Sequence, residues 1–196
     1  INGAAEFKVL KKKYAKGIEL REKTLGIIGF GKIGQFTAKY ALGAGMNVLA
    51  YDPFIEKTTI DLKIANQEIK VPISTCSLEI LLKNSDFISL HVPMPKDGQP
   101  LISTNEFNSM KKGVRIVNAA RGGVIDESAL VKAIKNEIVS FAALDVFVGE
   151  PYPNESLLKN ANYKKYEYEE LIRKEKSREI FLSILKKHYL SLAFFT

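Results

Sequence analysis

A chain of 196 residues, 46% of them apolar, is long enough to form one folded domain with a substantial core. Its net charge of +7 lies at the ends, because residues 1–23 and 159–196 each carry +4 and residues 24–158 carry −1. With no basic groove of interleaved aromatic residues, this distribution argues against nucleic-acid binding. No apolar run approaches the roughly 20 residues of a membrane span. The single cysteine, Cys76, excludes an internal disulfide and indicates a reducing, cytoplasmic compartment, and we expect it to be a small buried residue.

The first predicted element is a short helix and connector over residues 1–23, which leads into the stretch Thr24–Pro53. That stretch begins with a short apolar strand, Leu25–Phe30. Apolar residues then recur at helical spacing from Ile33 to Ala44, and a second strand, Asn47–Tyr51, follows. Strand, helix and strand in this order predict a βαβ unit with parallel strands.

A G-x-G-x-x-G motif joins the first strand to the helix, and the second strand ends in an acid. Gly29 permits the tight turn, Gly31 lets the backbone approach a pyrophosphate, and Gly34 lets the helix pack closely on the strand. A pyrophosphate would then lie on the free N–H groups at the helix N-terminus. Asp52, 18 residues after Gly34, is placed to accept hydrogen bonds from ribose hydroxyls and to repel a 2′-phosphate, so NAD is the expected cofactor. The alternative is an ordinary glycine-rich turn and a surface Asp-Pro.

Strands and helices continue to alternate after this unit. Within the connector Phe54–Ser74, the alternating piece Ile60–Val71 predicts a small hairpin across Asn66-Gln67. The later elements are a helix Leu78–Lys83 after Ser77, a strand Asp86–Leu90, a helix from Ser103 to Met110 with a capping box at Glu106, a strand Val114–Val117, a helix Glu127–Lys135 after Asp126, and a strand Phe141–Leu144. This repetition predicts an α/β fold, a Rossmann-type doubly wound parallel sheet covered on both faces.

Polar residues follow the carboxyl ends of the predicted strands, where ligands bind in open α/β sheets. Arg121 lies between a strand and two glycines, so its guanidinium could grip a carboxylate and polarise an adjacent carbonyl. The alternative for Arg121 is an internal salt bridge with Asp145 or Glu150. His91 follows another strand and could be a base, a cofactor neighbour or a satisfied histidine at the sheet edge, and we favour the last two.

These residues carry a family resemblance. The segments GIELREKTLGIIGFGKIG, GMNVLAYDP, SDFISLHVPMP, MKKGVRIVNAARGGVIDESAL and AALDVFVGEP resemble the NAD-binding domain of the D-isomer-specific 2-hydroxyacid dehydrogenases. The resemblance runs from about Gly17 to about Asn160. It implies NAD-dependent oxidation of a small-molecule 2-hydroxy acid, and it is strongest to the members that oxidise 3-phosphoglycerate and so open serine biosynthesis. It also implies a homodimer formed through the cofactor domain, with no metal site.

The same resemblance assigns roles to individual residues. Arg121 matches the substrate-binding catalytic arginine of the family, and Glu150 matches the glutamate that partners a catalytic histidine. The positions that match NAD contacts of the family, together with the glycines of the motif, are Gly29, Gly31, Lys32, Ile33, Gly34, Asp52, His91, Val92, Pro93, Ala119, Ala120 and Asp145.

The chain departs from the family after Glu150. The family has a Thr-Pro-His-like segment a couple of dozen residues beyond this glutamate, whereas the only later histidine here is His188, in other surroundings. We therefore divide the chain into a connector helix (1–23), a dinucleotide-binding domain (24–153) and a divergent tail (154–196). Apolar residues at helical spacing between Phe181 and Leu192 suggest an amphipathic helix in the tail, and a displaced reading frame is an equal alternative. The family's substrate domain is absent from the sequence, which keeps open a non-catalytic, NAD-responsive binding or scaffold protein.

Overall fold

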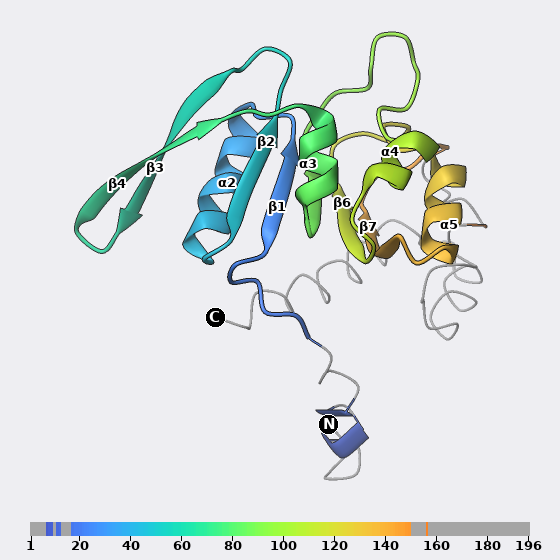
Figure 1. The fold of residues 1–196 in the computed structure, drawn as a ribbon, viewed down its shortest axis with the longest axis horizontal. Helices are drawn as coiled ribbons and strands as arrows, with labels where there is room; N and C mark the ends of the chain where they lie inside the picture. The colour runs from blue at the N-terminus through green and yellow to red at the C-terminus, as the bar shows by residue number, and fades with distance from the viewer. Residues whose placement is uncertain (1–6, 10, 13–16, 150–155, 157–196) are drawn as a thin grey trace.

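The computed structural model describes residues 7–9, 11–12, 17–149 and 156, and its centre is a five-stranded sheet (Figure 1). The strands are β1 (Thr24–Ile28), β2 (Asn47–Tyr51), β5 (Phe87–Leu90), β6 (Val114–Asn118) and β7 (Val139–Leu144). They lie in the order β2-β1-β5-β6-β7, and every neighbouring pair is parallel. The chain leaves β1 toward β2 and returns to β5 on the other side of β1. The predicted doubly wound sheet is therefore confirmed, with its switch point between β1 and β5, where such sheets bind ligands.

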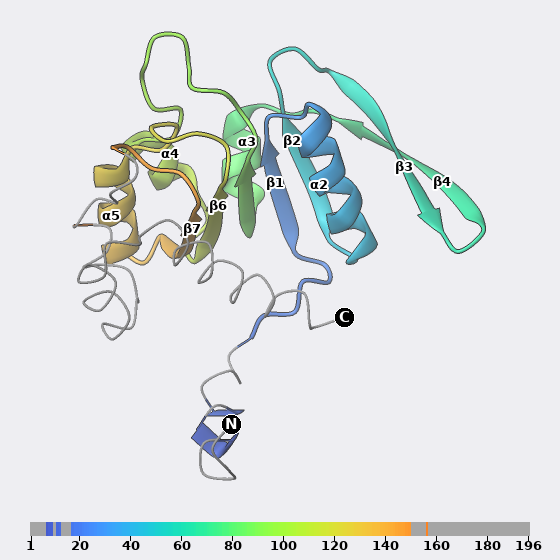
Figure 2. The same ribbon diagram turned by 180° about the vertical axis from the view of Figure 1, so that it is seen from behind.

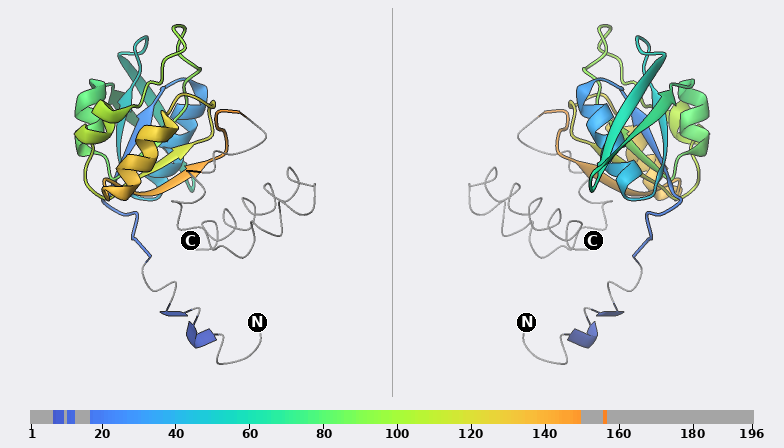
Figure 3. Two further views of the ribbon diagram at one scale, coloured as in Figure 1. Left: turned by 90° about the vertical axis from the view of Figure 1, so that its right-hand side faces the viewer. Right: turned by 90° about the vertical axis from the view of Figure 1, so that its left-hand side faces the viewer.

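Helices cover both faces of this sheet, as Figures 2 and 3 show. The helix α2 (Lys32–Gly43) packs on one face through small residues such as Ala38 and Ala41. The opposite face is covered by α3 (Leu78–Asn84), α4 (Thr104–Ser109) and α5 (Glu127–Lys135). The sequence predicts these four helices to within a residue at each end. No helix in the described part of the chain is long and apolar enough to span a membrane.

The connector after β2 forms a longer hairpin than predicted, and it turns one residue earlier. Its strands are β3 (Lys57–Ile64) and β4 (Gln67–Ser74), so the turn lies at Ala65-Asn66 rather than at Asn66-Gln67. Ala65 takes the left-handed conformation that such a two-residue turn requires, with φ of 52°. One face of the hairpin packs against α2 through Ile60 and Leu62, which are buried.

Beyond β4 the chain lies along the free edge of β2. The N–H of Cys76 donates to the carbonyl oxygen of Ala50 at 2.8 Å. Cys76 is half-buried rather than fully buried as the sequence suggested. Burial raises the pKa of its thiol, so this cysteine is a poor nucleophile.

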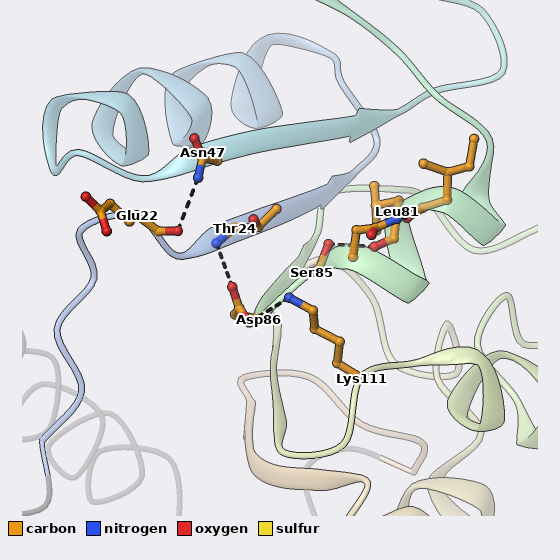
Figure 4. Close-up of polar contacts among 9 residues, drawn as sticks. Glu22, Thr24, Asn47, Leu81, Ser85, Asp86 and Lys111 are labelled. Atoms are coloured by element: carbon orange, nitrogen blue, oxygen red, sulfur yellow. Dashed lines mark hydrogen bonds and ion pairs between the residues drawn. The ribbon is translucent and has the colours of Figure 1, made fainter.

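The amino ends of the strands are joined by a small polar cluster, shown in Figure 4. One carboxylate oxygen of Asp86 accepts a hydrogen bond from the N–H of Thr24 at 2.8 Å, and the other lies 3.0 Å from the ammonium of Lys111. Burial alone would raise the pKa of Asp86, but these hydrogen bonds and the nearby lysine charges outweigh it and hold the pKa below its ordinary value. This cluster fixes β1 to β5 at the end of the sheet opposite the candidate site.

Candidate cofactor and substrate site

The glycine turn after β1 has the geometry that the motif predicts. Gly29 has φ of +92°, a conformation that favours glycine. A Cβ atom on Gly34 would collide with the carbonyl oxygen of Gly29, so only glycine allows helix and turn to approach so closely. A Cβ on Gly31 would meet no atom within 4 Å. The turn is therefore tightly packed on its inner side and open at Gly31, where a ligand could approach the backbone.

The N-terminus of α2 faces this opening. Its N-cap is Gly31, which has no side chain to cap the helix, and the first helical hydrogen bond runs from the N–H of Gln35 to the carbonyl of Gly31 at 2.9 Å. The N–H groups of Lys32, Ile33 and Gly34 precede that bond and are the orphan donors of a helix start. Ile33 is also 68% exposed. These features fit a dinucleotide whose pyrophosphate lies on the first turn of α2.

Asp52, at the end of β2, contacts the same turn directly. Its Oδ2 atom accepts a hydrogen bond from the N–H of Phe30 at 2.8 Å, and its Oδ1 atom accepts one from the N–H of Phe54 at 2.9 Å. Each carboxylate oxygen keeps a second lone pair that can accept from a ribose hydroxyl. The residue predicted to bind the ribose thus also fixes the position of the glycine turn.

The loop after β5 approaches the turn from the other side. The N–H of His91 donates to the carbonyl of Ile28 at 2.7 Å, and a Cβ on Gly29 would be crowded by the His91 backbone and the Val92 side chain. The Nε2 atom of His91 lies 2.9 Å from the hydroxyl of Ser89. Burial lowers the pKa of His91, so the imidazole is neutral at pH 7. His91 is therefore a satisfied histidine beside the expected cofactor site; Pro93 continues the same loop.

Arg121 lies on a turn that follows β6, with Ala119 and Ala120 before it. The Arg121 side chain is exposed, and its Nη1 atom donates to the carbonyl of Ala120 at 2.6 Å. Among the described residues Arg121 forms no ion pair; Asp145 is described, whereas Glu150 lies outside the described part of the chain. The guanidinium is available to a carboxylate ligand at the carboxyl edge of the sheet.

Two buried polar residues that sequence reasoning missed hold the segments around Arg121. Asn118, 2% exposed, accepts a hydrogen bond from the N–H of Ala120 at 3.1 Å and donates one to the carbonyl of Arg121 at 3.0 Å. Glu127, 8% exposed, accepts from the N–H of Val148 at 2.6 Å. Asn118 lies in the segment that carries Arg121 and that resembles the family, so its place in that segment could have marked it as a candidate. The contact of Glu127 joins residues 21 apart in sequence, and no local pattern predicts it.

A cleft of about 680 Å³ lies between the Arg121 turn and the loop after β7. It is lined by Met94 and Gly98 from the loop after β5, by Gly122 and Gly123, by the N-terminus of α5, and by residues 147–149. A Cβ on Gly122 would collide with the Phe147 backbone, so these two segments pack directly on each other. Asp145, at the start of the second segment, donates its N–H to the carbonyl of Asn118 at 2.9 Å. Gly122, which lines the cleft, directly follows Arg121 in the chain, whereas neither Arg121 nor Asp145 lines the cleft itself. Glu150 and His188 lie outside the described residues, as does the predicted tail apart from Ser156.

Comparison with known proteins identifies this arrangement. The family model for the D-isomer specific 2-hydroxyacid dehydrogenase NAD binding domain matches residues 3–164. A hydroxypyruvate reductase of Thermotoga maritima is 47% identical over 145 residues, which are 74% of this chain and 44% of that protein. A D-3-phosphoglycerate dehydrogenase of Archaeoglobus fulgidus is 45% identical over 153 residues, 78% of this chain and 28% of that protein.

Solved structures agree with the sequence comparisons. The D-lactate dehydrogenase of Aquifex aeolicus, solved with NAD and lactic acid, is 34% identical and has a TM-score of 0.60 over 79% of this chain and 48% of that one. The apo D-mandelate dehydrogenase of Rhodotorula graminis is 31% identical with a TM-score of 0.65, over 80% and 44% of the two chains. The chain spans less than half the length of these relatives. It belongs to the D-isomer-specific 2-hydroxyacid dehydrogenase family, of which it carries the NAD-binding domain.

Proposed function

We propose that this chain is the cofactor-binding half of an NAD-dependent dehydrogenase that interconverts a D-2-hydroxy acid and its 2-oxo acid. The observation that carries the proposal is the position of Arg121. Arg121 is exposed and lies on the turn after β6. Only one strand, β5, separates β6 from β1 and from the glycine turn that fits a dinucleotide. A carboxylate held by Arg121 would place the substrate at the same edge of the sheet as the cofactor.

In this function NAD supplies the hydride acceptor and donor. Asp52 and the amides of the first turn of α2 hold the dinucleotide. Arg121 binds the substrate carboxylate and polarises the developing carbonyl. By the family resemblance, Glu150 would support the basicity of a catalytic histidine and stabilise its cation. The sequence after Glu150 has no Thr-Pro-His-like segment, so we assign no histidine to this proton transfer.

The finer assignment that we favour is D-3-phosphoglycerate dehydrogenase, the enzyme that opens serine biosynthesis. Several of the similar proteins carry this name, including those of Archaeoglobus fulgidus and Methanocaldococcus jannaschii. Others are named hydroxypyruvate reductase or glyoxylate reductase, so the substrate must be tested directly. We further propose that the protein is a cytoplasmic homodimer. Sedimentation velocity would measure the size of the assembly.

The test compares NADH oxidation with 3-phosphohydroxypyruvate, hydroxypyruvate and glyoxylate. We expect the highest kcat/KM with 3-phosphohydroxypyruvate and a loss of about 100-fold in Arg121→Lys, because lysine cannot make the bidentate contact. Arg115→Lys is the matched control, since Arg115 lies within β6, before the Arg121 turn, and its guanidinium carbon lies 5.5 Å from the centre of the Phe87 ring. A preference for glyoxylate would overturn the finer assignment.

The second candidate is a non-catalytic, NAD-responsive binding protein, which the missing histidine segment favours. It predicts that the chain binds NADH but oxidises none of it with any of the three 2-oxo acids. A measurable turnover that depends on Arg121 would exclude this candidate.

A further inference from the structure

We propose that Asn118 is a positioning residue for Arg121, whose side-chain amide fixes the turn that presents the guanidinium. The inference rests on the proposed function, because it assigns Arg121 the task of binding a substrate carboxylate. It adds a residue whose side-chain hydrogen bonds, within the described part of the chain, both go to the backbone of the turn.

The first argument is that the two ends of the Asn118 amide are both used. Oδ1 accepts from the N–H of Ala120, and Nδ2 donates to the carbonyl of Arg121. Aspartate has no donor for the second bond when ionised, and leucine, of similar size, has neither group. At neutral pH, an amide of this length supplies both the acceptor and the donor that the two bonds require.

The second argument is that the clamp is rigidly held. Asn118 is the last residue of β6, pairs with Leu90 of β5 and Leu144 of β7, and is 2% exposed. Its backbone carbonyl accepts from the N–H of Asp145. A side chain anchored between two neighbouring strands transmits their rigidity to the turn.

The third argument is that no residue other than Ala120 in the described part of the chain supports the Arg121 side chain. Its guanidinium is exposed and bonds to the carbonyl of its own neighbour, Ala120. Bidentate recognition of a carboxylate requires the guanidinium to start from a defined position, and errors of about 1 Å are costly. The backbone that Asn118 holds is therefore the main determinant of where the guanidinium begins.

The experiment uses the full chain and two titrations. NADH affinity is measured by fluorescence, and oxalate, a dianion that resembles a 2-oxo acid, is then titrated into the NADH complex. We expect Asn118→Asp to keep NADH affinity within about threefold, because the Ala120 bond survives, and to bind oxalate about tenfold more weakly. Asn118→Leu should weaken both ligands. Asn84→Asp is the matched control, since it removes the amide donor to the carbonyl of Ile80 on an exposed helix end far from the site.

Three further readouts separate positioning from a general structural effect. Lowering the pH from about 8 to about 5.5 should restore oxalate binding in Asn118→Asp, because the protonated acid regains a donor for the Arg121 carbonyl. In Asn118→Asp combined with Arg121→Lys, the losses should be less than additive. Melting temperatures identify any variant that fails to fold, and then Asn118→Ser replaces it.

Folded Asn118→Asp with wild-type oxalate affinity, or with a loss that adds fully to that of Arg121→Lys, would overturn the inference. A wild-type chain that binds NADH but not oxalate would instead contradict the proposed substrate site. In that case NMR decides the inference: the Arg121 Nε–H signal should shift in Asn118→Asp and not in Asn84→Asp, and an unchanged signal would refute it.

Discussion

The Asp52 carboxylate lies 2.8 Å from the N–H of Phe30, so the acid at the end of β2 is bonded to the glycine turn at the end of β1. Asp52 thus braces the turn through the backbone, and in the role that we propose for it the free lone pairs of the same carboxylate would accept from a ribose. Loss of this carboxylate should therefore affect both stability and cofactor choice.

We predict that Asp52→Ala lowers the free energy of unfolding by about 1–3 kcal/mol, because the N–H of Phe30 loses its acceptor in a partly buried site. NADH affinity should fall about tenfold, and the preference for NADH over NADPH should narrow as the repulsion of a 2′-phosphate disappears. Urea unfolding and fluorescence titration with both cofactors measure these effects. Asp97→Ala, which removes a similar bond to Gln99 in an exposed loop, should change neither affinity. An unchanged NADH affinity in Asp52→Ala would refute the ribose assignment.

The glycines of the turn should separate packing from ligand binding. Gly34→Ala places a Cβ against the carbonyl of Gly29, so we predict a loss of stability of about 1–3 kcal/mol. Gly31→Ala meets no protein atom and has φ of −68°, which alanine adopts freely, so the fold should keep its melting temperature. Its methyl group would occupy the open space where we expect the pyrophosphate, so NADH affinity should drop about tenfold.

Thermal melts and NADH titrations of the two variants test this contrast. Gly43→Ala provides the control, because its Cβ would also meet no atom within 4 Å but lies at the other end of α2. Normal NADH binding by Gly31→Ala would show that the pyrophosphate does not approach this backbone.

Much of the fold could be predicted from local signals. The start of α5 follows from Asp126, whose carboxylate accepts from the N–H groups of Ser128 and Ala129, a capping arrangement that depends only on neighbouring residues. The glycine motif likewise predicts its own geometry, since Gly29 and Gly34 each answer to a steric demand of the turn and its neighbours.

The hairpin register shows a signal that was present but not used. A turn at Asn66-Gln67 keeps apolar residues opposite one another, so apolar alternation cannot distinguish the two registers. It would, however, place Lys63 opposite Lys70. The observed register pairs Lys63 with Glu68 and Asp61 with Lys70, which joins opposite charges. The contact between Glu127 and Val148 could not be predicted in this way. Only the complete sheet brings these two residues together, and no local sequence rule connects them.

Glu127 should act as an anchor for the loop after β7. Its buried carboxylate holds the N–H of Val148, so we predict that Glu127→Leu lowers the free energy of unfolding by about 2 kcal/mol and that Glu127→Gln, which keeps an acceptor, costs less than about 1 kcal/mol. Limited proteolysis with mass spectrometry should find faster cleavage within residues 145–149 in Glu127→Leu. Glu79→Leu is the matched control for Glu127→Leu, since Glu79 is an exposed acid in the first turn of α3. Equal cleavage rates in the two leucine variants would contradict the anchor.

His91 should make stability depend on pH in a defined direction. Burial lowers its pKa in the folded protein below the ordinary value of 6.5, so the unfolded chain binds the proton more readily. The contribution of His91 is therefore fully present above about pH 6.5 and is lost as the pH falls through the lower, folded-state pKa. NMR can follow the titration directly, because the chain has two histidines and His91→Gln assigns the signal. Urea unfolding across the same pH range should show a weaker decline in His91→Gln than in the wild type. A His91 resonance that titrates at or above pH 6.5 would mean that the imidazole is not held in a buried, neutral state beside Ser89.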